Sequence, residues 1–77
     1  MPTVFYSNGF RFFFYSNEND EPVHVHVEKG DGYGKIWLDP IESDYFNGFN
    51  AQEQRLIKKI VSENADLLKR KWYEYFR

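Results

Sequence analysis

The sequence predicts an α+β fold in which a meander of four or five antiparallel β-strands packs on one long C-terminal α-helix. Residues 1–49 contain short β-prone segments separated by turn-forming residues, and residues 50–77 form an amphipathic stretch without proline or glycine. A chain of 77 residues has room for one domain, so residues 1–77 are interpreted as a single unit. Its 8 Phe, 6 Tyr and 2 Trp can supply the buried apolar area that a small domain needs.

The first two strands are predicted at residues 4–7 and 11–16. An Asn-Gly dipeptide separates them, and a two-residue type I′ hairpin turn favours this pair because both of its positions need a positive φ. The second segment contains three consecutive phenylalanines and a tyrosine, so we expect both faces of this strand to be at least partly covered. A polar turn at residues 17–22 follows.

The third strand is predicted at residues 23–28, where three valines alternate with His24, His26 and Glu28. Successive side chains of a strand point to opposite faces. The valines would therefore pack in the core, and the two imidazoles and the carboxylate would share the other face. The chain has no other histidine.

The fourth strand is predicted at residues 35–39 and is ended by Pro40. Three glycines within residues 29–34 predict a flexible hairpin loop before it. Residues 41–49 combine turn-forming residues with aromatic ones, which predicts either a short edge strand or an irregular crossing.

A helix is predicted from Ala51 onward, because Asn50 followed by Glu53 is close to a capping box. At about 100° per residue, the apolar side chains fall in one arc with Asn64 in its middle. This arc comprises Leu56, Ile57, Ile60, Val61, Leu67, Leu68, Trp72 and Tyr75. A continuous helix to Phe76 would be roughly 39 Å long, about twice the length of a typical strand. Its last aromatic residues must therefore fold back, bury in a second copy or bind a partner.

Strand phase predicts which side chains accompany the histidines. If the valines face the helix, Ile36 and Leu38 face it as well, as do Phe12 and Phe14. The opposite face then carries a mixture of cations, carboxylates, imidazoles and aromatic rings. Its members are Arg11, Phe13, Tyr15, His24, His26, Glu28, Lys35, Trp37 and Asp39.

One hypothesis for this face is a divalent metal site. His24 and His26 would supply nitrogen ligands, and Glu28 or Asp39 would supply an oxygen ligand, a donor set that suits zinc or a similar ion. Apart from such an ion, the sequence indicates no cofactor.

A second hypothesis is a ribonuclease-like site. Glu28 would act as general base toward a ribose hydroxyl, and His24 or His26 would act as the acid toward the leaving oxygen. Arg11 or Lys35 would bind the phosphate.

The third hypothesis, which we favour, is a binding face for a protein partner or for a second copy of the chain. Tyr15, Lys35, Trp37 and Asp39 are the binding candidates. Aromatic side chains among charges are typical of the centre of an interface, where a few anchors contribute most of the binding energy.

The two halves of the chain carry opposite charge. Residues 1–50 hold three basic and eight acidic residues, whereas residues 51–77 hold seven basic and four acidic residues. Such polarity favours self-association as a homodimer, and the basic face of the helix offers a surface for nucleic acid. That face comprises Arg55, Lys58, Lys59, Lys69 and Arg70.

The chain has no cysteine, which excludes a disulfide framework and a thiolate zinc finger. We expect a cytoplasmic protein without a signal peptide and without a membrane partner, because the first residues lead directly into a strand and no long apolar run follows.

Several segments resemble a small bacterial and phage family known as domain of unknown function 4160. They are residues 10–18, 21–28 and 35–38, together with Lys71-Trp72. The resemblance implies a protein often encoded beside a second small protein, of domain of unknown function 2442, in an arrangement similar to a toxin–antitoxin pair. It identifies Arg11, His24, His26 and Glu28 as motif residues without an established role. We therefore expect a small partner-binding protein that binds through the sheet face of His24, His26 and Trp37.

Overall fold

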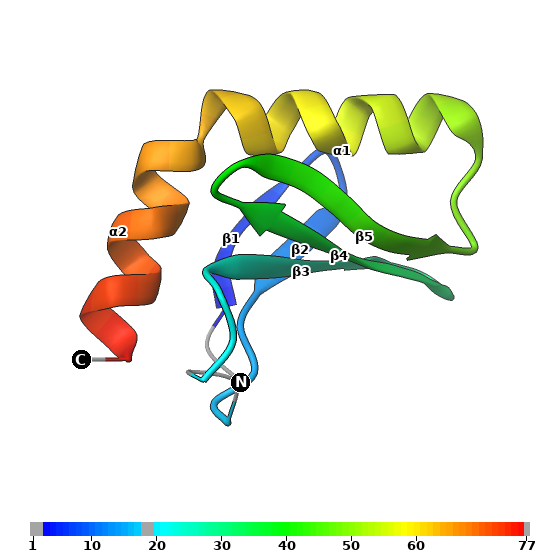
Figure 1. The fold of residues 1–77 in the computed structure, drawn as a ribbon. Helices are drawn as coiled ribbons and strands as arrows, with labels where there is room; N and C mark the ends of the chain where they lie inside the picture. Colours follow the sequence, from blue (N-terminus) through cyan, green and yellow to red (C-terminus); the bar gives the residue numbers. More distant parts are fainter. Residues whose placement is uncertain (1–2, 18–19, 77) are drawn as a thin grey trace.

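The computed structural model describes residues 3–17 and 20–76, which form five strands followed by two helices (Figure 1). The strands are β1 (Thr3–Ser7), β2 (Phe10–Phe13), β3 (His24–Lys29), β4 (Gly32–Leu38) and β5 (Ile41–Asn47), and the helices are α1 (Ala51–Glu63) and α2 (Ala65–Tyr75). All neighbouring strands are antiparallel and lie in the order β1-β2-β3-β4-β5, which confirms the predicted meander. Within these residues, no helix has the length and apolar content needed to span a bilayer.

The first hairpin is confirmed at the turn between β1 and β2. Asn8 and Gly9 have φ values of 54° and 82°, as a type I′ turn requires. For residues 41–49 the sequence predicts either an edge strand or an irregular crossing, and the structure has the edge strand. It is β5, which pairs along β4 with one register shift, between Lys35 and Ile36.

The glycine-rich segment differs from the prediction, because β4 begins at Gly32 and includes two of its glycines. A Cβ on Gly32 would lie 2.5 Å from the ring of Phe49, and one on Gly34 would lie 2.7 Å from the ring of Phe46. These glycines therefore let two aromatic rings pack directly on the strand backbone. The tight turn is limited to the residues before them, where Gly30 has a φ of 58°.

The core lies between α1 and one face of the sheet, which we call the inner face (Figure 1). Every side chain predicted to face the helix is buried there, as are apolar residues of both helices. The buried apolar cluster comprises Phe10, Phe12, Phe14, Val23, Val25, Val27, Ile36, Leu38, Phe49, Ile57, Ile60, Val61, Leu68 and Trp72.

The predicted single long helix is wrong: the chain forms two helices that meet at Asn64. The predicted start is confirmed, since Asn50 and Glu53 form a reciprocal capping box. At the break, the Asn64 side chain donates a hydrogen bond of 2.8 Å to the carbonyl of Ile60, which also accepts from the backbone N–H of Asn64 at 3.1 Å. After it, α2 turns down past one end of the strands (Figure 1). Trp72 folds back onto the same chain and is buried, and Phe76 is half-buried, whereas Tyr75, which the sequence predicts in the apolar arc, is exposed.

Candidate functional site

The face of the sheet opposite α1, which we call the outer face, carries the predicted set of side chains in three rows across the strands. The first row is Tyr6, Arg11, Glu28, Tyr33 and Asn47; the second is Phe13, His26, Lys35 and Tyr45; the third is His24, Trp37 and Glu42. The alternation in the sequence thus predicted the correct face for each of the strand residues that it named. Asp39 follows the end of β4 and is exposed.

Both histidines are buried on this face. The ring of His24 lies 4.7 Å from the ring of Trp72 and 5.5 Å from that of Trp37, measured between centroids. The ring of His26 lies 5.0 Å from His24 and 4.6 Å from Tyr15. The imidazoles therefore belong to an aromatic cluster that includes a side chain of α2.

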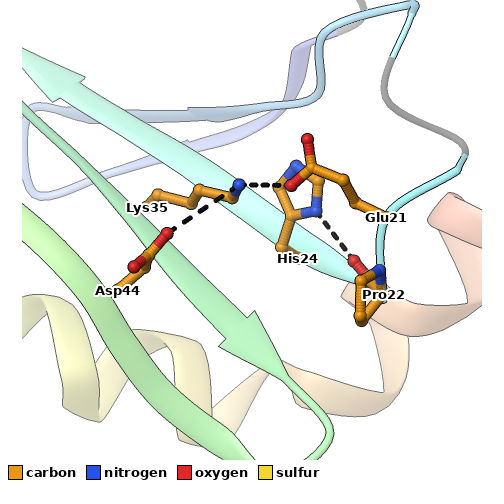
Figure 2. Close-up of polar contacts among 5 residues, drawn as sticks. All are labelled: Glu21, Pro22, His24, Lys35 and Asp44. Atoms are coloured by element: carbon orange, nitrogen blue, oxygen red, sulfur yellow. Dashed lines mark hydrogen bonds and ion pairs between the residues drawn. The ribbon is translucent and has the colours of Figure 1, made fainter.

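Residues 20–22, which lead into β3, are fastened over the outer face beside the histidines (Figure 2). The Lys35 ammonium donates to the Glu21 carboxylate at 2.5 Å and lies 3.9 Å from the Asp44 carboxylate. Nδ1 of His24 lies 2.9 Å from the carbonyl oxygen of Pro22, and because a carbonyl only accepts, the ring donates this hydrogen bond. These contacts thus hold residues 20–22 close to the histidines.

Replacing Glu21 with glutamine is expected to loosen the attachment of residues 20–22 to the sheet. Lys35 would lose its nearest carboxylate while its side chain remained largely buried, so we expect the free energy of unfolding to fall by about 1–2 kcal/mol, between the values of exposed and buried ion pairs. Urea denaturation gives the change in stability, and amide hydrogen exchange at residues 20–23 reports the loosening.

Asp44→Asn is the matched control, because Asp44 lies farther from the same ammonium. We expect it to change the stability by less than about 0.5 kcal/mol. Equal effects of the two substitutions would contradict a fastening role for Glu21.

Arg11 is occupied by three contacts within the chain. Its Nη1 donates to the Glu28 carboxylate at 2.7 Å, and its Nε donates to the Thr3 hydroxyl at 2.9 Å. Its guanidinium carbon lies 4.3 Å above the centre of the Phe13 ring. This cation therefore fastens β1 and β3 to β2.

This arrangement bears on the two chemical hypotheses. In the ribonuclease hypothesis, the histidine that acts as the acid must contact the substrate. His24 and His26 are buried, so this conformation does not present either ring to a substrate. For a metal, the described residues contain no group of three or more His, Cys, Asp or Glu side chains that could hold an ion. Glu28, the predicted oxygen ligand, is paired with Arg11.

The candidate binding residues are divided between surface and interior. Tyr15 is exposed and Trp37 is half-buried, whereas Lys35 is buried with its ammonium 4.4 Å from the centre of the Trp37 ring. On the helices, the predicted basic residues Arg55, Lys58, Lys59 and Arg70 are exposed, and Lys69 is half-buried. They belong to α1 and α2 and do not contribute to the rows of the outer face.

Three exposed tyrosines of the outer face were missed from the sequence: Tyr6, Tyr33 and Tyr45. Tyr33 and Tyr45 lie edge to face, with their ring centres 6.2 Å apart. The sequence predicts a hairpin loop at Tyr33 and either an edge strand or an irregular crossing at Tyr45. The available signal was the spacing of Tyr33, Lys35 and Trp37, which are two positions apart and therefore lie on the same face of a strand. This pattern extends β4 back to the residues before Lys35.

The family model described as Domain of unknown function (DUF4160) matches residues 9–73. No curated protein and no solved structure matches the chain.

Proposed function

The chain belongs to the family described as Domain of unknown function (DUF4160), a description that names no activity, and from its outer face we propose that it is a partner-binding protein. The setting would be a two-protein module similar to a toxin–antitoxin pair, with the second small protein as the partner. Binding would occur on the first row of the outer face together with Tyr45. We call this region the tyrosine surface, formed by Tyr6, Arg11, Glu28, Tyr33, Tyr45 and Asn47.

The observation that carries the proposal is the exposure of three tyrosines on a sheet face that α1 leaves uncovered. A tyrosine offers a large apolar contact area, loses little conformational entropy when it is fixed, and has a hydroxyl for a polar contact. The neighbouring Arg11–Glu28 ion pair is ordered by its contacts with Thr3 and Phe13, so this part of the surface is preorganised.

The histidines have a supporting role in this proposal. His24 and His26 fill the space beneath the connection at residues 20–22 and contact the rings of Trp37 and Tyr15. They thereby fix the second and third rows, next to the tyrosine surface. The binding surface that we propose is thus displaced toward Tyr33 and Tyr45 from the histidine-centred surface predicted from the sequence.

A double substitution tests the proposal: Tyr33→Ala with Tyr45→Ala. Removing two interface anchors is expected to weaken binding of the second small protein of the module by at least about 100-fold, because each anchor contributes on the order of 2 kcal/mol to the binding free energy. Isothermal titration calorimetry with the two purified proteins gives the Kd.

Tyr73→Ala is the matched control, because Tyr73 is an exposed tyrosine of α2 that lies outside the outer face. It should leave the Kd within about twofold of the wild type. Unchanged binding by the double variant would overturn the proposed surface. RNA cleavage by the wild-type protein that is lost in His26→Ala, with the fold retained, would favour the ribonuclease alternative.

A further inference from the structure

Charge is segregated by depth on the outer face. In each of its two ion-pair groups the cation is inside and the carboxylates are outside. The Arg11 and Lys35 side chains are 17% and 10% exposed, whereas those of Glu28, Glu21 and Asp44 are 44%, 37% and 40% exposed. An approaching molecule therefore meets carboxylates before it meets cations.

The remaining charges on this side of the sheet have the same sign. Glu42 is exposed opposite Trp37 in the third row, and Asp20 and Asp39 are exposed at the adjoining connections. Lys29, the other cation of the five strands, lies with its ammonium 4.9 Å from the ring centre of Phe10, a residue of the inner-face core. Lys29 is exposed but shares the inner-face phase of Val25 and Val27, so among the described strand residues the outer face has no exposed cation beside its carboxylates.

We propose that the tyrosine surface binds a segment of a protein partner that is rich in arginine or lysine. The exposed carboxylates that border this surface, Glu42 and Asp44 among them, would bind the same cationic segment. This inference rests on the proposed function and assigns the partner its chemistry. Guanidinium and ammonium groups are attracted to the faces of tyrosine rings and form charge-assisted hydrogen bonds with carboxylates. Tyr33 and Tyr45 provide such rings, and the Asp44 carboxylate lies next to Tyr45 in the chain.

A second copy of the chain fits this surface less well. Its basic residues lie on α1 and α2, whereas its carboxylates lie on the outer face, so one copy would use a different surface from the other. Contacts of this type are heterologous and build rings or open chains rather than a two-fold dimer. The structure therefore favours a separate basic partner.

The test uses labelled nine-residue peptides of alternating arginine and glycine, with a matched glutamate–glycine peptide, and fluorescence anisotropy on the full chain. We expect the arginine peptide to bind, the glutamate peptide not to bind, and affinity to fall as salt rises, since exposed charges are screened. The variant Glu42→Gln with Asp44→Asn should weaken binding by about fivefold or more. Glu63→Gln, at an exposed site on α1, is the matched control and should bind as the wild type does.

The outcomes separate this inference from the proposed function. In one outcome, Tyr33→Ala with Tyr45→Ala abolishes binding of the second small protein of the module, but neither Glu42→Gln with Asp44→Asn nor competing arginine peptide affects that binding. The inference is then wrong, and the proposed surface stands. Failure of the arginine peptide to bind, or equal binding of the glutamate peptide, also overturns the inference. Concentration-dependent self-association that the charge variant abolishes, seen by sedimentation without peptide binding, would assign the surface to a second copy instead.

Discussion

Replacing Trp72 with alanine is expected to lower the free energy of unfolding by about 3–5 kcal/mol, which approaches the whole stability of a domain of this size. Trp72 is buried, and its ring lies 5.4 Å from Phe14, 4.7 Å from His24 and 4.2 Å from Phe76, measured between centroids. Its removal leaves a void where α2 meets the end of the sheet. Urea denaturation followed by circular dichroism measures the loss.

The neighbouring residue provides the control for this prediction. Tyr73 is exposed on the same helix, so Tyr73→Ala is expected to change the stability by no more than about 0.5 kcal/mol. A similar loss in both variants would mean that α2 is sensitive to any truncation, and the specific role assigned to Trp72 would be wrong.

His24→Ala is expected to lower the free energy of unfolding by about 2–4 kcal/mol, because it combines a cavity with a lost hydrogen bond. The His24 ring is fully buried against Trp37 and Trp72, and the Pro22 carbonyl accepts its hydrogen bond. An exposed histidine kept for catalysis would produce almost no change. Chemical denaturation therefore distinguishes the two roles.

His24→Phe separates the two contributions within that prediction. It retains a ring but not the hydrogen bond to Pro22, so we expect it to recover more than half of the stability lost in His24→Ala. If His24→Ala instead keeps wild-type stability while removing an RNA-cleaving activity, the catalytic role would be supported and our structural assignment rejected.

Local sequence patterns predicted which face of the sheet each strand residue occupies. Because the side chains of a strand alternate strictly, the faces of the residues in β2, β3 and β4 followed once the valines were assigned to the core, whereas the pairing of individual residues across the strands comes from the structure. The capping box of α1 was predictable for the same reason: it depends on Asn50 and Glu53, three positions apart.

The covering of a face was not predictable in this way. Burial of His24 and His26 depends on residues 20–22 and on Trp72, which are brought there by the tertiary fold. The break at Asn64 is similar, because the apolar arc continues through it and the helical pattern alone gives no reason to stop. The break becomes understandable once the sheet is seen to be shorter than the two helices together, so that α2 must turn to bury its apolar side (Figure 1).

Trp72 contacts both sides of the sheet, since it touches Phe14 of the inner-face core and His24 of the outer face. The hydrophobic interior thus passes around the ends of the strands instead of stopping at the sheet. We therefore expect α2 and the histidine end of β3 to unfold as one cooperative unit. A substitution on the buried side of the last helix is then expected to disturb the outer face of the sheet, although the two are far apart in the chain.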